Sequence, residues 1–176
     1  KYVNGNSYGE SSRIANHPLG NNRVYYNDET GQKSFGITHN YRLGMNYAFS
    51  KNHRLDVAYT GHWDKRCSNS NTTGSSISGM HHDSHEYLHN VDVNYSLPFG
   101  LTLNGSYTYY RTPQQQALDG TMHTDESMSE TERNLTSGSE QTINKWMFTA
   151  DQTHSLANGW GFSYGVKGQF ASNKSY

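Results

Sequence analysis

Apolar and polar residues alternate with a period of two along six segments of this chain, and this alternation limits its fold more than any other feature. Between residues 34 and 49 the odd positions are mostly apolar and the even positions mostly polar or small. The apolar members are Phe35, Ile37, Tyr41, Leu43, Met45, Tyr47 and Phe49. Successive side chains of a β-strand point to opposite faces, so each segment is expected to be a strand with one apolar face.

The six segments form three pairs, each joined by a short turn. The pairs are residues 34–49 with 54–63, 87–97 with 101–109, and 146–154 with 162–170. Their turns are Ser50 to His53, Pro98-Phe99-Gly100 and the dipeptide Asn158-Gly159, which is a strong hairpin signal. Gln152 and His154 interrupt the apolar face of the last pair, which predicts a bulge or a membrane boundary near them.

Composition excludes several other classes of protein. Only 32% of the 176 residues are hydrophobic, too few for one conventional core, whereas 13% are aromatic, more than disordered chains carry. No apolar run reaches the roughly 18 residues of a helical membrane span. A net charge of −1 without a basic patch argues against a nucleic-acid partner, and Cys67 alone can build no disulfide. A β-barrel is the membrane architecture that remains.

Long polar stretches, residues 9–33, 66–84 and 113–142, separate the hairpins and are loops by composition. Short turns thus alternate with long loops, as periplasmic turns and extracellular loops do in outer-membrane barrels. Aromatic residues gather beside the short turns and again about ten residues away, which matches one strand crossing of the bilayer. The alternative is that these aromatics fill the core of a soluble β-sandwich. The polar face, with residues such as Asn46, Asp92 and Lys167, suits a hydrated lumen.

The fold expected from these features is all-β: an antiparallel transmembrane β-barrel segment of about seven meander strands, with residues 1–176 in a single domain. The stretch from Tyr2 to Tyr8 supplies the seventh strand. Bacterial single-chain barrels have an even number of strands, so we expect an internal fragment of a larger barrel in a bacterial outer membrane.

Three hairpins, NYRLGMNYAFSKNHRLDVAYTGHW, HNVDVNYSLPFGLTLNGSYTYYRTP and DQTHSLANGWGFSYGVKGQF, resemble the barrel strands of TonB-dependent outer-membrane receptors, especially the outer-membrane β-barrel family common in Bacteroidetes. The resemblance covers most of the chain and lies in the pattern of the strands and turns more than in a signature motif. It implies a barrel of about 22 strands with a plugged lumen. It also implies import of a nutrient or metal chelate, an inner-membrane energy-coupling complex reached through the plug, a surface lipoprotein partner, and outer-membrane lipid around the barrel. The alternative is a smaller barrel with a structural, adhesive or passive-pore role.

The run GMHHDSHEYLH is the most distinctive local sequence. It places His81, His82, His85 and His89 close together, and imidazole is a ligand for zinc, nickel or copper. At strand spacing His85 and His89 share a face, so a metal site requires His81 and His82 to fold over them. The alternative is a solvated polar loop, since no standard metal-ligand spacing is matched.

Neither enzyme motifs nor a cofactor-binding motif occurs in the sequence. The chain has no nucleophile elbow, P-loop or zincin spacing, so we expect that it is not an enzyme and that it carries no cofactor. The segment of residues 113–142 is acidic, with Arg133 as its only cation, and is expected to be a solvated charged loop rather than a ligand site.

Overall fold

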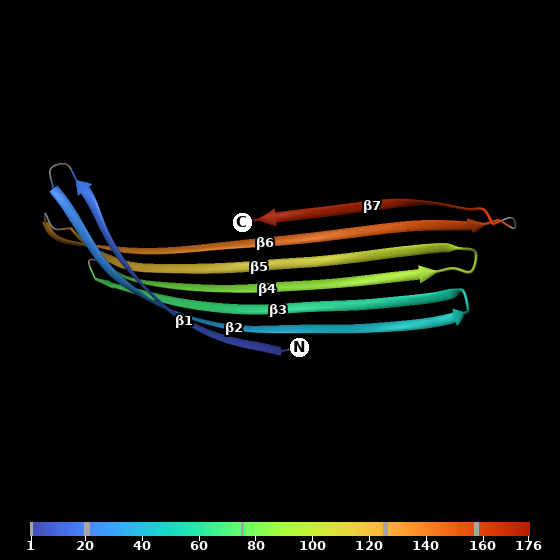
Figure 1. Ribbon diagram of the computed structural model, residues 1–176, viewed down its shortest axis with the longest axis horizontal. Coiled ribbons are helices and arrows are strands. Elements are labelled where there is room, and N and C mark those ends of the chain that lie inside the picture. The colour runs from blue at the N-terminus through green and yellow to red at the C-terminus, as the bar shows by residue number, and fades with distance from the viewer. Residues whose placement is uncertain (1, 20–21, 75, 125–126, 157–158) are drawn as a thin grey trace.

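The computed structural model describes residues 2–19, 22–74, 76–124, 127–156 and 159–176. These residues form seven antiparallel strands in one sheet, in the order of the sequence (Figure 1). The strands are β1 (Tyr2–Leu19), β2 (Asn22–Ser50), β3 (His53–Gly74), β4 (Ser76–Ser96), β5 (Leu101–Thr124), β6 (Ser127–Ser155) and β7 (Gly161–Ser175). The all-β antiparallel meander predicted from the alternation is therefore confirmed.

The connections β2–β3, β4–β5 and β6–β7 lie together at one end of the sheet, on the right in Figure 1, which we call the short-turn end. Gly100 has φ +84°, which a residue with a side chain rarely adopts, and the N–H of Gly100 donates to Leu97 O at 3.2 Å. Gly159 also has φ +84° and its N–H donates to Leu156 O at 3.2 Å, whereas Asn158 lies outside the described residues. The turn residues of the sequence thus sit where the backbone requires them.

The three long polar stretches are strands over their described residues, so the prediction of loops is wrong. The pairing of β1 with β2 runs without interruption from Tyr2 opposite His39 to Leu19 opposite Asn22. Short polar side chains bond across the strands, as where the hydroxyls of Thr30 and Thr72 lie 2.9 Å apart. A strand with two hydrophilic faces shows no apolar alternation. The composition of these segments therefore predicted loops where the chain forms the outer parts of long β-hairpins. We call their end of the sheet the long-hairpin end.

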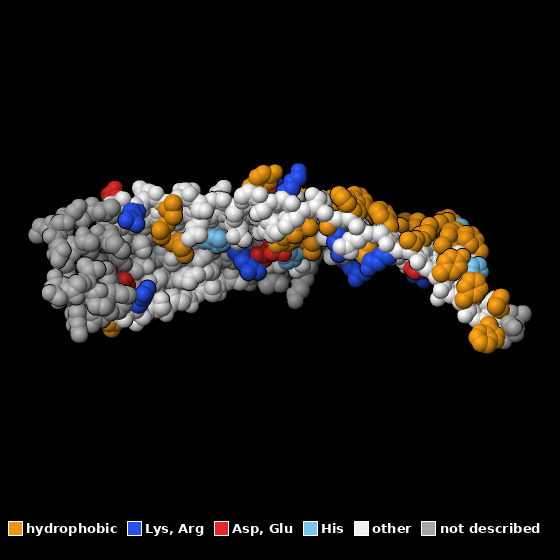
Figure 2. Space-filling view, turned by 90° about the horizontal axis from the view of Figure 1, so that it is seen from above, with side chains coloured by type: hydrophobic (Ala, Val, Ile, Leu, Met, Phe, Trp, Pro, Cys, Tyr) orange, Lys and Arg blue, Asp and Glu red, His pale blue; other side chains and the backbone are white. Residues whose placement is uncertain are grey.

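Residues that pair directly across two antiparallel strands lie on the same face of the sheet, so the register fixes which side chains share a face. Most of the large apolar residues of β2 to β7 fall on one face, whereas Leu88, Ile143 and Met147 lie on the other. This apolar face comprises Leu43, Met45, Tyr47, Leu55, Val57, Tyr59, Val91, Val93, Tyr95, Leu103, Tyr107, Trp146, Phe148, Ala150, Val166 and Phe170. In Figure 2 the hydrophobic side chains gather toward the short-turn end, whereas the described residues farther along are mostly polar.

The pairing of β6 with β7 contains no bulge at Gln152 or His154, so of the two expected explanations the bulge is wrong and the membrane boundary stays a prediction. Both residues stay in register, opposite Tyr164 and Phe162 respectively. The amide of Gln152 donates to Phe99 O at 2.7 Å, and the ring of His154 stacks on Phe162 at 4.9 Å. Because these polar groups find partners beside the turns, the strand accommodates them without a shift of register.

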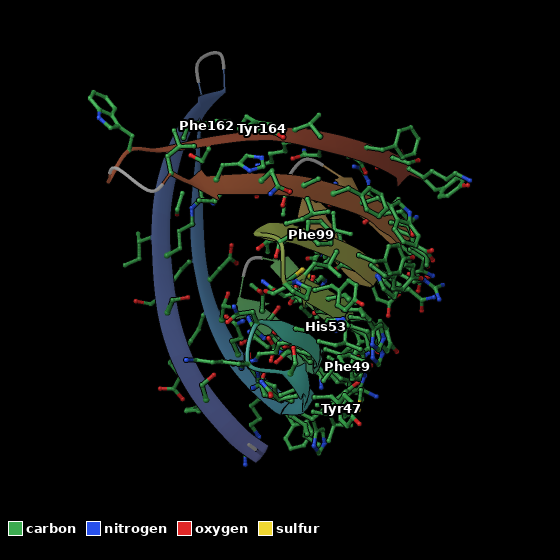
Figure 3. The ribbon with its side chains drawn as sticks, turned by 90° about the vertical axis from the view of Figure 1, so that its right-hand side faces the viewer. Tyr47, Phe49, His53, Phe99, Phe162 and Tyr164 are labelled. Atoms are coloured by element: carbon green, nitrogen blue, oxygen red, sulfur yellow. The ribbon has the colours of Figure 1, made fainter. Side chains whose placement is uncertain are left out.

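The sheet is an open, curved layer rather than a closed barrel (Figure 3). β1 and β7 are its edges and do not pair with each other in the described residues. No hydrophobic side chain that the structure describes is buried, and Trp160 and Phe170 are among the exposed ones. Among these residues no helix has the length and hydropathy of a membrane span. The stability of the sheet therefore depends on what covers its apolar face.

Candidate functional site

The face opposite the apolar one is mostly polar across β2 to β7. The register places on it Arg42, Asn46, Asp56, Thr60, Asn90, Asp92, Asn94, Asn104, Ser106, Thr108, Thr149, Lys167 and Gln169. Except for Thr108 and Thr149, which the register adds, the sequence pattern assigns these residues to the polar face, together with Asn40 and His62. The register confirms that they share one face. We call this surface the polar wall.

A ladder of side-chain hydrogen bonds crosses the polar wall near the short-turn end. The amide of Asn94 donates to Asn104 Oδ1 at 2.7 Å, and the amide of Asn104 donates to Thr149 Oγ1 at 2.9 Å. On the neighbouring strands, the amide of Asn46 donates to Asp56. Asp56 lies directly between Asn46 and Asn94 in the register, so β2 to β6 each contribute one member to this row. The polar groups of the wall thus satisfy one another and hold their positions.

Asp64 of β3 is the most protected polar residue of the wall, with 5% of its surface exposed. Its carboxylate accepts a hydrogen bond from the Thr38 hydroxyl and lies 2.8 Å from Arg66 Nε. Glu86 pairs directly with Asp64, and His62 Nε2 lies 3.9 Å from Glu86 Oε1. Two carboxylates directly opposite each other destabilise a sheet unless cations or donors compensate them, and these three neighbours supply that compensation.

A hollow of about 630 Å³ lies beside Asp64 toward the long-hairpin end, and Phe35, Cys67 and Met80 line it together with polar residues. Small residues of the polar wall make room for it, among them Ser34, Gly36 and Ser68, and Asp64 and His82 are part of its lining. The hollow combines a carboxylate, a guanidinium, an imidazole and several hydroxyls. It can accept a polar ligand through several hydrogen bonds but presents no nucleophile held by a base.

The four histidines proposed as metal ligands do not converge. His81, His85 and His89 lie on the apolar-face side of β4, whereas His82 lies on the polar wall. His85 and His89 are separated by four residues, or about 13 Å along an extended strand, too far to bind one ion. His62, a further candidate ligand, also lies on the polar wall. Within the described residues no group of three or more His, Cys, Asp or Glu side chains is placed to hold a metal.

His81, His85 and His89 instead each contact a side chain on the same strand or an adjacent one. His81 Nδ1 lies 2.5 Å from Asn69 Oδ1, and His85 Nε2 lies 3.6 Å from Asp83 Oδ2. His89 Nδ1 lies 2.7 Å from the hydroxyl of Tyr59, and its ring stacks with that of Tyr109. The cluster in the sequence is therefore spread along one strand.

Aromatic rings line both ends of the apolar face. At the short-turn end the labelled rings in Figure 3 come from all three hairpins, and Phe49 contacts both Tyr47 at 4.7 Å and His53 at 4.4 Å. Toward the long-hairpin end, Trp63 pairs directly with Tyr87 and stacks on His39 at 5.1 Å. The spacing between the two rows agrees with the ten residues expected from the sequence.

The acidic segment of residues 113–142 takes part in a bidentate ion pair that the sequence did not predict. Arg111 Nε and Nη2 donate to the two carboxylate oxygens of Glu140 at 2.9 and 2.8 Å. These hydrogen bonds hold the pKa of Glu140 below its usual range. Of the other acids of this segment, Asp125 and Glu126 lie outside the described residues. Asp64 was also missed, because its burial arises from neighbours that are distant in sequence.

No protein-family model matches the chain, and no curated protein sequence matches it. Among solved structures, the ferric yersiniabactin uptake receptor FyuA of Yersinia pestis is 8% identical over 99% of this chain and 30% of that one, with a TM-score of 0.39. The ferric preacinetobactin receptor BauA of Acinetobacter baumannii is 10% identical over 98% of this chain and 35% of that one, with a TM-score of 0.36. The chain thus spans about a third of the length of these receptors, and likenesses this distant carry no argument about its function.

Proposed function

We propose that this chain is part of the wall of an outer-membrane β-barrel, with its apolar face against lipid and its polar wall toward a hydrated lumen. One observation carries the proposal: every strand from β2 to β7 places most of its large apolar residues on the same face, and that face is left uncovered. A soluble sheet with such a face would need a second layer against it. A bilayer supplies the cover, and the aromatic rows at both ends match its two interfaces.

Within that wall we assign the short-turn end to the periplasm and the long-hairpin end to the outside. Strands such as β2, with 29 residues, far exceed the roughly 9 to 11 residues that cross a bilayer. The parts of these hairpins that are polar on both faces of the sheet therefore extend beyond the membrane. They would form the rim through which a ligand reaches the lumen and the hollow beside Asp64.

The specific role that we propose is transport: the barrel of a TonB-dependent receptor that imports a nutrient or a metal chelate. The sequence resemblance motivates this role, and the hydrogen-bonded ladder of the polar wall supports it because it offers a hydrated surface for a plug or a passing ligand. On this proposal the partners are outer-membrane lipid, an energy-coupling complex and a surface lipoprotein. The proposal assigns this chain no catalytic step.

The test uses the intact protein isolated from its native membrane, with its mass measured and its conductance recorded in planar bilayers. A receptor predicts a polypeptide several times heavier than 19.9 kDa and a closed pore that opens only when a plug is unfolded by urea. A light polypeptide with a steady open conductance would refute the receptor role and favour the passive pore. A protein that enters no bilayer would refute both.

A further inference from the structure

An open groove of about 580 Å³ runs over the apolar face between β4 and β7. It exists because two glycines flank one aromatic residue: Gly105 and Gly168 both pair directly with Phe148. A Cβ on Gly168 would meet no atom within 4 Å, so the surface is hollow at this point. Tyr107 and Trp146 add aromatic walls on the side toward the long-hairpin end.

Cationic side chains lie on the same face, toward the long-hairpin end of the groove. Arg111, Thr142 and Lys174 form one row across β5, β6 and β7. Arg111 is neutralised by Glu140, whereas the structure gives Lys174 no carboxylate partner within the described ranges. The Thr142 hydroxyl between them donates to Glu140 Oε1 at 3.4 Å. The row therefore has one uncompensated positive charge, the exposed ammonium of Lys174, and an ammonium is a group that binds phosphate.

The spacing between row and groove matches one lipid leaflet. Each member of the row lies six residues from its counterpart in the row of Gly105, Phe148 and Gly168. Six residues span roughly 20 Å along a strand. With the usual strand tilt this is a depth of about 15 Å, half the thickness of the hydrocarbon core.

We propose that this surface is a binding site for a phosphate-bearing membrane lipid, whose acyl chain lies in the groove over Gly168 and whose phosphate contacts Lys174. The site rests on the proposed placement of the apolar face in the membrane, but not on the transport role. Charge complementarity selects this occupant: a zwitterionic lipid fills the groove equally well but gains less from Lys174.

The experiment measures the association of spin-labelled phosphatidylglycerol and spin-labelled phosphatidylcholine with the intact protein in phosphatidylcholine vesicles. The wild type is expected to prefer phosphatidylglycerol about fivefold, the effect of one lysine near a charged headgroup. Lys174→Gln is expected to reduce this preference to near one. Lys167→Gln is the matched control, because it removes the same charge from the same strand on the polar wall.

A second pair of variants tests the groove. Gly168→Leu fills it and is expected to lower the immobilised fraction of both lipids, whereas Ala171→Leu, on the polar wall of β7, leaves both unchanged. A salt series on the wild type tests the charge without any variant. Raising the salt from 0.1 to 1 M shortens the Debye length from about 10 to 3 Å and is expected to remove the preference for phosphatidylglycerol.

The inference is overturned if the wild type inserts but shows no preference, or if Lys167→Gln abolishes it as fully as Lys174→Gln. Failure of the wild type to insert into vesicles would overturn the membrane placement as well, so the two failures are distinguishable.

Discussion

An arginine at position 93 is expected to destabilise the membrane-inserted protein strongly, whereas one at position 94 is not. Val93 lies on the apolar face in the row of Val57 and Gly105, about midway between the two aromatic rows. Arginine on the lipid-facing side at the midplane costs about 2 to 4 kcal/mol. That cost lowers the folding equilibrium roughly 30- to 700-fold.

Asn94 is the next residue along β4 and lies on the polar wall, so Asn94→Arg is the matched control. The substitution removes the 2.7 Å hydrogen bond to Asn104 but places a cation directly opposite Asp56. The two effects offset each other, and we expect a change below about 1 kcal/mol.

The assay is urea unfolding of the intact protein in phosphatidylcholine vesicles. Unfolding is followed by the loss of the SDS-resistant, fast-migrating band of the folded protein in gels of unheated samples. The reasoning is refuted if the two arginine variants unfold at the same urea concentration, or if Asn94→Arg unfolds at a lower urea concentration than Val93→Arg.

Three further substitutions test local features with the same unfolding assay. Gly61→Ala is expected to cost about 1 kcal/mol, because its Cβ would lie 2.0 Å from the ring of Tyr41, which must swing away; an unchanged midpoint would contradict this packing. Asp64→Ala is expected to cost about 1 to 2 kcal/mol of stability, since it leaves the Thr38 hydroxyl and the Arg66 guanidinium without their acceptor. A more stable variant would show that the carboxylate is not needed. The pKa of Glu140 is lowered by Arg111, so the stabilisation is present above the usual glutamate pKa of about 4.3 and is lost as pH falls through the lower folded value. Glu140→Gln should therefore remove an acid-sensitive component of stability, and an unaltered pH profile would argue against this ion pair.

Local signals predicted the hairpins near the short turns correctly. The alternation from Phe35 to Tyr47 predicted the right face for each apolar residue, because burial on one side of a strand leaves a period of two in the sequence. Gly100 marked its turn because only glycine tolerates that backbone conformation readily. Tyr2 to Tyr8 was recognised as strand, although β1 continues to Leu19.

Long-range pairing could not be predicted in the same way. The strand arms that contain Thr30 and Thr72 depend on partners more than 40 residues away, and nothing in their composition separates them from loops. The histidine run failed as a site for a related reason, since an extended β4 spreads His81 to His89 along its length. Asp64 and the ion pair of Arg111 with Glu140 likewise emerge only when the register brings separate strands together.

The central claim, that one face of the sheet meets lipid and the other meets water, is tested most directly by a nitroxide scan of residues 88–96 in β4. The intact protein, with Cys67 replaced by serine, carries one label at a time in phosphatidylcholine vesicles, and collisions with oxygen and with a water-soluble nickel chelate are measured. The account predicts a period of two, with oxygen contact highest at odd positions such as Val91 and nickel contact highest at even positions such as Asn90. Nickel contact at every position, or no alternation at all, would contradict it.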